Sequence, residues 1–128
     1  MPRKKILLVD DAETILMMER LILHNEYDLV TARNGQEAVS AAASERPDLI
    51  LLAVVMPTMD GFAACKKIRE SKEIGAVPII MVTTRAEQEN VEKAFQSGCN
   101  DYIAKPINSV ELISKIRNCL SEQQGGVQ

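Results

Sequence analysis

Five short apolar runs, separated by longer stretches with helical periodicity, constrain the fold of this chain more than any other feature. The runs cover residues 5–9, 27–32, 48–53, 77–82 and 102–104. They are almost continuously apolar, a pattern typical of strands that are buried on both faces. Alternation of such strands with helices predicts a parallel sheet covered on both sides, and right-handed crossovers make it a doubly wound α/β fold.

Helices are predicted between and after these strands, at residues 12–24, 35–44, 60–70, 86–96 and 108–120. In the first helix, Ile15, Met18 and Ile22 share one face and are expected to be buried. Asp60 is a candidate N-cap of the third helix. Gly98 follows the fourth helix, where a left-handed C-terminal cap is expected.

The last predicted helix has the clearest start signal. Asn108 is a candidate N-cap, and Glu111 lies three residues later, as in a capping box. Ile113, Ile116 and Leu120 would then form the buried face of this helix. The polar, glycine-bearing residues 121–128 are interpreted as a free tail or the start of a linker, so we expect one domain over residues 1–120.

Composition and charge argue against several classes of protein. The 128 residues carry a net charge of -3, which disfavours a general surface for nucleic acid or anionic membranes. No apolar run approaches the roughly 20 residues that span a bilayer. The apolar stretch behind the basic start is too short for a signal peptide, so a cytoplasmic location is expected. Three widely spaced cysteines and one histidine, His24, indicate reduced thiols rather than a zinc site.

Polar side chains gather where the predicted strands end. Asp10 and Asp11 follow the first strand, and Ala53 ends the third. Thr83 follows the fourth strand and Lys105 follows the fifth. In doubly wound folds, ligands bind outside the carboxyl ends of the strands, so we expect these residues to face one site.

The residue types at these strand ends suit phosphoryl chemistry. Two close carboxylates repel each other unless a cation lies between them, and they suit Mg²⁺, which keeps waters and phosphate oxygens as further ligands. A lysine ammonium and a threonine hydroxyl can bind other phosphoryl oxygens, because phosphoryl transfer depends mainly on positioning and charge neutralisation. An acceptor nucleophile would lie at the end of the central strand, where the chain has Ala53.

Four segments carry a resemblance to a known family: LLVDD (7–11), PDLILLAVVMPTMDG (47–61), PIIMVTT (78–84) and DYIAKP (101–106). Over about residues 4–120 the chain resembles the receiver domain of bacterial two-component response regulators, and its length is close to that of single-domain regulators of the chemotaxis type. The resemblance implies a flavodoxin-like (β/α)5 fold with strand order 2-1-3-4-5. In that family an aspartate at the end of the third strand accepts a phosphoryl group from a histidine kinase.

The resemblance also implies a role for each matching site residue. Asp10 and Asp11 would bind Mg²⁺ together with the main-chain carbonyl of Val55. Thr83 would donate a hydrogen bond to the phosphoryl group and report its presence, and Lys105 would pair with the same group.

A switch residue and a partner surface follow from the same resemblance. Tyr102 matches the aromatic residue whose ring turns inward on activation, and the peptide bond before Pro106 would be cis. The implied partners are a histidine kinase or phosphotransfer protein, and a downstream target that binds the face made by the fourth helix, fifth strand and fifth helix. Besides Tyr102, this face would include Glu89, Lys93 and Lys115. Direct binding of nucleic acid and membrane insertion are not expected.

The chain departs from the family pattern at the acceptor. Alanine has no nucleophile, so Ala53 cannot form an aspartyl phosphate, and we expect no enzymatic phosphoryl transfer and weakened Mg²⁺ binding. Every other site residue of the pattern is present. We hypothesise that Ala53 is an engineered substitution of an aspartate that keeps the domain inactive. The alternative is a natural, phosphorylation-independent receiver that acts as an interaction module.

Two enzyme or carrier classes with related folds fit less well. A flavin-binding electron carrier would use main-chain amides of a Ser/Thr/Gly-rich loop after the first strand, but residues 10–13 here are Asp-Asp-Ala-Glu. A phosphatase with an aspartyl intermediate would also need the missing nucleophile. Most of the methionines Met17, Met18, Met56 and Met59 are interpreted as core or core-edge residues.

Overall fold

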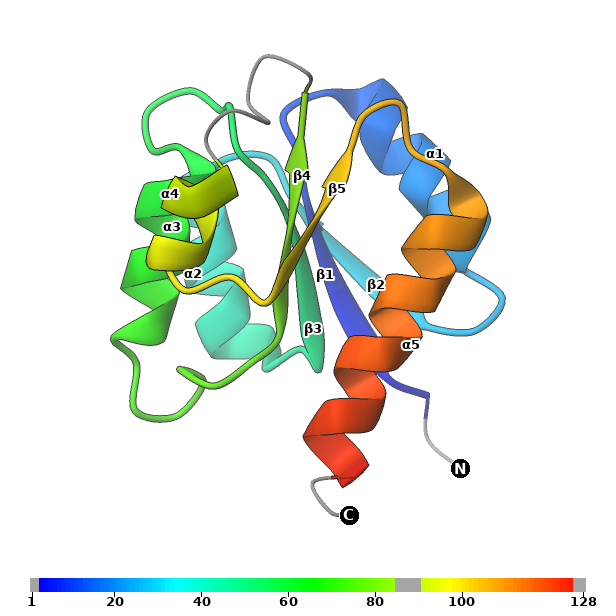
Figure 1. The fold of residues 1–128 in the computed structure, drawn as a ribbon. Coiled ribbons are helices and arrows are strands. Elements are labelled where there is room, and N and C mark those ends of the chain that lie inside the picture. The colour runs from blue at the N-terminus through cyan, green and yellow to red at the C-terminus, as the bar shows by residue number, and fades with distance from the viewer. Residues whose placement is uncertain (1–2, 85–90, 126–128) are drawn as a thin grey trace.

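The computed structural model describes residues 3–84 and 91–125, which form one five-stranded parallel sheet with helices on both faces. Its strands lie in the order β2-β1-β3-β4-β5 (Figure 1). Their bounds are Lys5–Val9 for β1, Asp28–Ala32 for β2, Leu49–Ala53 for β3, Ile79–Thr83 for β4 and Asp101–Ala104 for β5. The predicted fold class and strand order are confirmed.

Helices α1 and α5 cover one face of the sheet, and α2, α3 and α4 cover the other (Figure 1). Their bounds are Glu13–Leu23 for α1, Gly35–Glu45 for α2, Gly61–Arg69 for α3, Val91–Gln96 for α4 and Ser109–Gly125 for α5. Residues 86–90 of the predicted fourth helix lie outside the described residues. The last helix continues through Gly125, into the segment that we interpreted as a tail.

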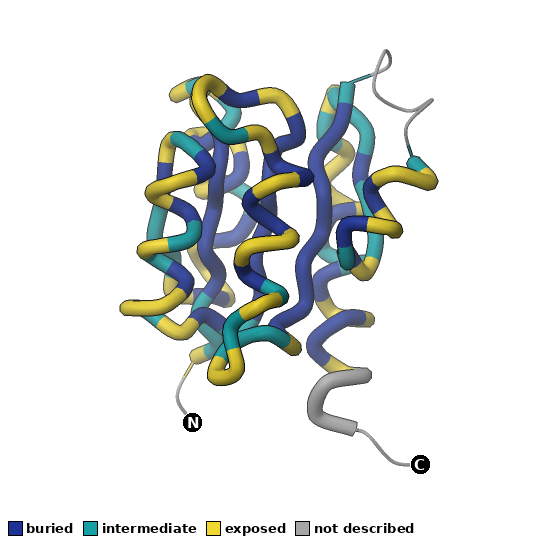
Figure 2. Tube along the Cα trace, turned by 90° about the vertical axis from the view of Figure 1, so that its left-hand side faces the viewer, coloured by how far each residue is buried: buried dark blue, intermediate teal, exposed yellow. Residues whose placement is uncertain are grey.

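The central strands are continuously apolar because helices bury both of their faces. Every residue of β3 and of β4 is buried, and Figure 2 shows these strands as dark blue segments through the middle of the molecule. Alternate residues serve the two faces: Ile6 and Leu8 of β1 pack on the side of α1 and α5, whereas Leu7 and Val9 pack on the side of α2 and α3. The core is therefore two apolar layers separated by the sheet.

Side-chain caps fix the starts of three helices. The side chain of Asn34 accepts a hydrogen bond from the backbone N–H of Glu37, and that of Asp60 accepts one from Ala63. Asn108 accepts from the N–H of Glu111 at 2.9 Å, so the predicted N-caps at Asp60 and Asn108 are confirmed. Each cap satisfies one of the free N–H groups in the first turn. Gly98 has φ +110, the left-handed conformation that was expected there.

The predicted buried face of α1 is wrong by one position. Met18 is 41% exposed, and the buried residues are Leu16, Glu19 and Leu23. A glutamate at position 19 breaks the apolar pattern of the buried stripe, and the stripe was therefore assigned to Ile15, Met18 and Ile22. In α5 the buried face is Leu112, Ile116, Cys119 and Leu120, with Ile113 only partly buried. The interpretation of the methionines as core is wrong for Met17 and Met18, which are both exposed.

Across the described residues, no helix is both long enough and apolar enough to cross a membrane.

Candidate functional site

The strand-end residues do meet at the carboxyl edge of the sheet, the upper edge in Figure 1. Ala53 pairs with Val82 at the end of β3 and β4, which places Ala53 beside the strand that ends in Thr83. The backbone N–H of Lys105 donates to the carbonyl of Thr83 at 2.6 Å, which fixes these two residues side by side. The parallel register therefore brings residues from three distant segments to one edge.

Asp10 lies inside this edge and Asp11 lies on its surface. Asp10 is 1% exposed, and its Oδ1 accepts a hydrogen bond from the N–H of Ala12 at 2.9 Å. Its Oδ2 is 3.3 Å from Nζ of Lys105. The carboxylate and the ammonium form an ion pair without a hydrogen bond, and Oδ2 has no hydrogen-bond partner among the described residues. Asp11, by contrast, is exposed.

A third carboxyl, which the sequence did not point to, belongs to this electrostatic cluster. Glu19 of α1 is 1% exposed, and its Oε1 has no hydrogen-bond partner within the described part of the chain. Burial, and then the negative charge of Asp10, raise the pKa of Glu19 to about 8, while the ammonium of Lys105 acts in the opposite direction. The spacing of Glu19 between Leu16 and Leu23 is the sequence signal that could have revealed its burial.

Thr83 and Tyr102 lie on neighbouring strands. Thr83 is buried, and its hydroxyl donates to the carbonyl of Ile103 across a long 3.4 Å contact. Tyr102 is half-buried, and its ring meets Phe95 edge-on with the centroids 6.2 Å apart. Nζ of Lys115 lies 5.0 Å from the centroid of the Tyr102 ring and donates to its backbone carbonyl.

The loop from β3 to α3 is held tightly against the strand end. The N–H of Gly61 donates to the carbonyl of Val54 at 2.7 Å. A Cβ at Gly61 would lie 2.2 Å from the carbonyl oxygen of Ala53, so only glycine permits this approach. Thr58, at the tip of the loop, has φ +71. Val55 is 63% exposed, at the surface of the same edge.

The acidic residues fit a hard divalent cation that keeps several water ligands. Such an ion is usually held by one or two carboxylates. Oδ2 of buried Asp10, which makes no hydrogen bond, and the exposed carboxylate of Asp11 are ligands of that kind. In the described residues, no three side chains of His, Cys, Asp or Glu converge on a point. Ala53 stands at the strand end from which a further carboxylate would come.

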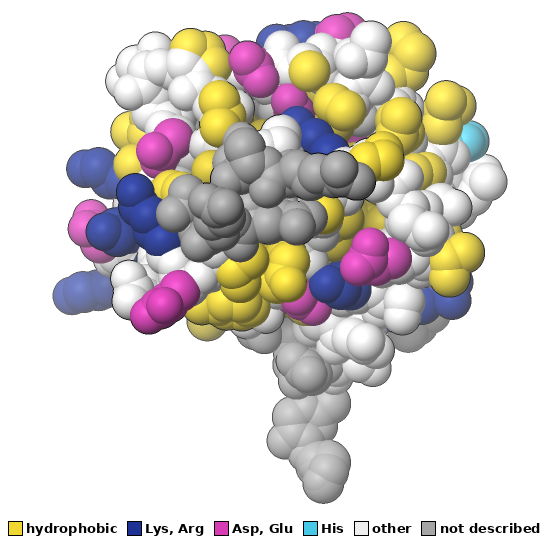
Figure 3. All heavy atoms as spheres, turned by 45° about the horizontal axis from the view of Figure 1, so that its top comes forward, with side chains coloured by type: hydrophobic (Ala, Val, Ile, Leu, Met, Phe, Trp, Pro, Cys, Tyr) yellow, Lys and Arg dark blue, Asp and Glu magenta, His cyan; other side chains and the backbone are white. Residues whose placement is uncertain are grey.

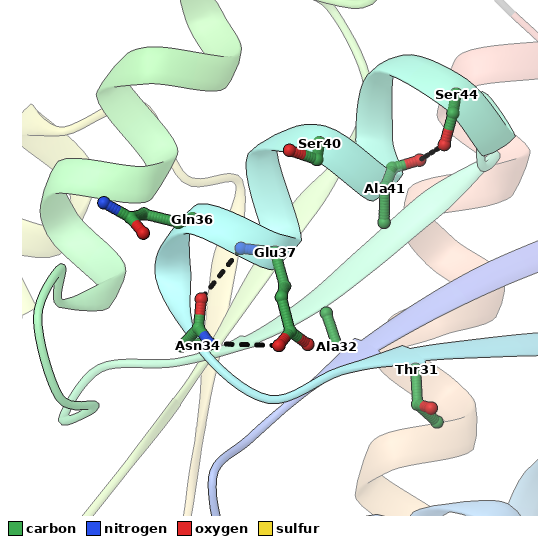
Figure 4. Close-up of a pocket in the computed structure, with 8 residues that line it drawn as sticks. All are labelled: Thr31, Ala32, Asn34, Gln36, Glu37, Ser40, Ala41 and Ser44. Atoms are coloured by element: carbon green, nitrogen blue, oxygen red, sulfur yellow. Dashed lines mark hydrogen bonds between the residues drawn. The ribbon is translucent and has the colours of Figure 1, made fainter.

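The surface around this edge carries charged side chains of both signs (Figure 3). Figure 3, which brings this edge forward, shows acidic and basic side chains side by side among apolar ones. An open pocket of about 500 Å³ lies elsewhere, between β2 and α2, and Figure 4 shows its lining of small polar side chains such as Ser40 and Ser44. That pocket is lined by Ala32, the last residue of β2, but by none of Asp10, Ala53, Thr83 and Lys105.

The peptide bond between Lys105 and Pro106 is cis, as the resemblance implied. Of the residues assigned to the site, Asp10 and Lys105 are in direct contact, Thr83 adjoins Lys105, and Asp11 and Val55 are exposed.

Comparisons with known proteins identify the family of this chain. The family model described as "Response regulator receiver domain" matches residues 6–117. The alkaline phosphatase synthesis transcriptional regulatory protein PhoP of Bacillus subtilis is 36% identical over 122 residues, which are 94% of this chain and 50% of that protein. The chain thus spans about half the length of the first curated relatives that it matches.

Solved structures of similar chains share the whole fold. A putative response regulator from Chloroflexus aurantiacus has a TM-score of 0.89 at 32% identity, with 93% of this chain and 98% of that chain covered. The receiver domain of the sensor histidine kinase PA1611 from Pseudomonas aeruginosa has a TM-score of 0.86 at 32% identity, with the same coverage, and its structure holds a magnesium ion in the active-site cleft. Taken with the strand-end geometry, these matches show that this chain belongs to the response regulator receiver family.

Proposed function

We propose that this chain is a two-component receiver whose phosphoacceptor position is occupied by Ala53. The observation that carries the proposal is the ion pair between buried Asp10 and partly buried Lys105 at the carboxyl edge that also holds the end of β3. An anion and a cation of this kind flank the position where the family's acceptor aspartate lies, and Ala53 offers only a methyl group there. As it stands, the chain carries out no phosphoryl transfer at position 53.

The proposed metal ligands are Asp10, Asp11 and the main-chain carbonyl of Val55. Mg²⁺ bound there would neutralise charge on a phosphoryl group and fix its orientation. Lys105 would bind one phosphoryl oxygen through its ammonium, and Thr83 would donate its hydroxyl to another. Oδ2 of Asp10 supports this assignment, because it is a buried acceptor that makes no hydrogen bond and has only its ion pair with Lys105.

We further propose that Ala53 replaces an aspartate by engineering. The phosphoryl-binding residues are otherwise complete, although an ion pair between buried Asp10 and partly buried Lys105, made without a hydrogen bond, brings little stability of its own. A receiver that had long ceased to be phosphorylated would have no need of that arrangement. A native alanine codon in the encoding gene would contradict this reading and favour a natural pseudo-receiver that acts as an interaction module.

The inactive conformer is the state that we assign to the Ala53 chain. In support, the Thr83 hydroxyl is turned toward β5 rather than toward position 53. It donates a hydrogen bond to the backbone carbonyl of Ile103. The ring of Tyr102 is only half-buried, against the partly exposed Phe95. Binding of a phosphoryl group would compete for the Thr83 hydroxyl and so favour the other conformer.

Partners are proposed from the family and from the α4–β5–α5 face. A histidine kinase or phosphotransfer protein would supply the phosphoryl group, and a downstream protein would bind the face that includes Tyr102, Lys93 and Lys115. Nζ of Lys115 lies over the Tyr102 ring, which holds this cation at the face, whereas Nζ of Lys93 lies over the ring of Phe62 in α3. Glu89, which was assigned to the same face, lies outside the described residues. A cytoplasmic location fits these partners.

The test is to restore the acceptor and offer a small phosphodonor such as acetyl phosphate with Mg²⁺. We expect Ala53→Asp to gain one phosphoryl group by intact-protein mass spectrometry, whereas the parent gains none. Ala53→Asn is the matched control, since it has the shape of aspartate without its nucleophilic oxygen pair. If Ala53→Asp stays unmodified while correctly folded, the proposed function is wrong.

The affinity for a target protein distinguishes a phosphorylation switch from an interaction module that does not respond to phosphorylation. A phosphorylated Ala53→Asp chain should bind a target with a different affinity from the Ala53 chain. Equal affinities with and without a phosphoryl analogue would favour the module.

A further inference from the structure

The segment that joins β2 to α2 contacts two loops of the carboxyl edge. One is the β1–α1 loop, which carries Asp10 and Asp11, and the other is the β3–α3 loop, which carries Val55. The segment, residues 33–37, is called the β2–α2 turn below. It contains none of the site residues assigned above, but it touches one loop through an ion pair and the other through a close backbone approach.

Local hydrogen bonds fix the conformation of the β2–α2 turn. The side chain of Asn34 accepts a hydrogen bond from the N–H of Glu37 at 2.8 Å, and its amide nitrogen donates to Oε2 of Glu37 (Figure 4). The other carboxylate oxygen of Glu37 accepts from the backbone N–H of Arg33 at 3.0 Å. This arrangement is a variant of the capping box. Because the turn is held by its own hydrogen bonds, it can support the loops on either side of it.

Gly35, the first residue of α2, packs directly against the backbone of the β3–α3 loop. A Cβ at Gly35 would lie 2.4 Å from the carbonyl oxygen of Met59 and 2.8 Å from its Cβ. Both distances are well below a van der Waals contact, so the absence of a side chain at Gly35 permits this approach. A larger residue would have to displace Met59, because a backbone oxygen cannot rotate aside as the end of a side chain can.

The β3–α3 loop would pass such a displacement on to Val55. Its two ends are joined by the hydrogen bond between Val54 and Gly61. At its tip, the N–H of Met59 donates to the carbonyl of Pro57 at 2.8 Å across a residue with φ +71, which is the geometry of a γ-turn. A shift of Met59 therefore falls on the residues between the two fixed ends, and Val55 is one of them.

Arg33 holds the β1–α1 loop from the other side of the turn. Its guanidinium donates to the carboxylate of Glu13, and the two side chains form an ion pair. Glu13 is the first residue of α1 and follows Asp11 by two residues. Both side chains are about half exposed, and pairs of this kind contribute little to the free energy of unfolding. The pair does, however, restrict where the loop with Asp11 can lie relative to the turn.

We propose that the β2–α2 turn is a positioning element of the metal site, in which Gly35 sets the place of the Val55 carbonyl and Arg33 that of Asp11. Mg²⁺ demands near-ideal octahedral geometry, so a displaced ligand weakens its binding. The inference rests on the proposed function in taking Asp11 and the Val55 carbonyl as metal ligands. It does not depend on phosphoryl transfer.

Gly35→Ala in the Ala53 chain tests the first contact, with Mg²⁺ affinity measured by NMR titration. The added methyl group should displace the β3–α3 loop and weaken Mg²⁺ binding about fivefold. Gly75→Ala is the matched control. A Cβ there would also lie 2.4 Å from a backbone oxygen, that of Ser71, but in the loop before β4, at the opposite edge of the sheet. It should change the affinity less than about twofold.

The carbonyl ¹³C resonance of Val55 gives a readout that a general loss of stability would not move. On Mg²⁺ saturation this resonance should shift in the parent and in Gly75→Ala. In Gly35→Ala its shift should be much smaller, whereas the carboxyl carbon of Asp11 should still respond. This difference would assign the effect of Gly35 to one ligand.

Removal of the ion pair tests the second contact without a change of net charge, and it serves also if Gly35→Ala does not fold. Glu13→Gln combined with Arg33→Gln should weaken Mg²⁺ binding about threefold, with a smaller response of the Asp11 carboxyl carbon at saturation. The matched control combines Glu26→Gln with Arg117→Gln, which removes another exposed ion pair and should leave the affinity unchanged.

The role of Gly35 would be overturned by equal affinities in the parent and Gly35→Ala, by equal losses in Gly35→Ala and Gly75→Ala, or by a full Val55 response in Gly35→Ala. An affinity that does not change on removal of the Glu13–Arg33 pair would overturn the role of Arg33.

The proposed metal site itself fails separately. A parent chain in which Mg²⁺ shifts neither Val55 nor Asp11 would contradict that site, and the positioning role with it. Phosphorylation of Ala53→Asp is measured independently, so failure of the proposed function is distinguished from failure of this inference.

Discussion

At the scale of single residues, Glu19 makes stability depend on pH in an unusual direction. Burial and Asp10 raise its pKa from 4.5 to about 8. Between these values the folded chain keeps a proton that the unfolded chain has released, so the free energy of unfolding falls as pH rises. The stabilisation is complete below pH 4.5 and is lost as pH passes through about 8. The slope for one such group approaches about 1.4 kcal/mol per pH unit.

Glu19→Gln should therefore remove this slope in the metal-free protein. Urea denaturation at several pH values between 5 and 9 measures it, with Glu26→Gln as the control that keeps the slope. Superimposable pH profiles for the parent and Glu19→Gln would show that the carboxyl is ionised in the folded state throughout.

Thr58 is a second residue whose conformation is unfavourable for its side chain. Its φ of +71 is a left-handed conformation, which β-branched residues rarely adopt. Thr58→Gly should raise the free energy of unfolding by about 1 kcal/mol, because relief of strain exceeds the extra freedom of the unfolded chain. Gly98→Ala is the opposite control: its φ is +110, and the added Cβ would lie 2.9 Å from Cγ of Arg69. A destabilised Thr58→Gly chain would show that the threonine side chain has a stabilising contact.

At the scale of elements, Arg69 joins α3 to the segments on either side of β4 and α4. Its Nε donates to the carbonyl of Gly98 at 2.9 Å, and one terminal nitrogen donates to the carbonyls of Gly75 and Val77. The other donates to the side chain of Asn100. The planar guanidinium can reach all of these acceptors at once, whereas a lysine ammonium cannot.

Arg69→Lys should consequently lower the free energy of unfolding by about 2 kcal/mol, because partly buried carbonyls lose their donors. Lys66→Met, which changes an exposed cation of the same helix, should change stability by less than about 0.5 kcal/mol. Denaturant unfolding of both variants measures the difference. Equal stabilities would mean that water replaces the guanidinium without cost.

The elements also show where sequence information ends. Strands β3 and β4 could be predicted from the sequence because both of their faces are buried, which leaves an unbroken apolar run. The N-caps at Asp60 and Asn108 could be predicted because a cap depends only on residues within one helical turn of it. The buried face of α1 could not be predicted in this way. A buried stripe is recognised by apolar residues at helical spacing, and Glu19 interrupts that pattern. Glu19 is 1% exposed and its Oε1 has no hydrogen-bond partner among the described residues, so its burial follows from the packing of α1 against the sheet.

At the scale of the whole molecule, the parallel sheet explains why the residues of the site could be predicted from the sequence. Strand ends meet at one edge whatever the sequence between them, so Asp10, Thr83 and Lys105 could be predicted to lie together. The ion pair between Asp10 and Lys105, and the contact of the Thr83 hydroxyl with Ile103, depend on side-chain conformations that the motifs do not specify. Those contacts required the structure.

Restoring the acceptor should cost stability in the absence of metal. Ala53 is 1% exposed, so Ala53→Asp adds a buried carboxylate close to Asp10, and repulsion should lower the free energy of unfolding by about 2 kcal/mol. Saturating Mg²⁺ should recover the loss, because the ion binds only the folded site. Thermal unfolding of Ala53→Asp and Ala53→Asn with and without Mg²⁺ measures this. A loss in Ala53→Asp that Mg²⁺ does not reverse would point to a steric rather than an electrostatic cause.

The central claim is that the end of β3 lacks one carboxylate of a site that is otherwise ready for a divalent cation. Its most direct test is the Mg²⁺ dissociation constant of the Ala53 chain against that of Ala53→Asp, measured under the same conditions by calorimetry or NMR. The account predicts binding about tenfold tighter, or more, for Ala53→Asp, because the added oxygen is a ligand and its charge attracts the ion. Ala53→Asn, which supplies an oxygen without the charge, should fall between them. Equal affinities for Ala53 and Ala53→Asp would contradict the account.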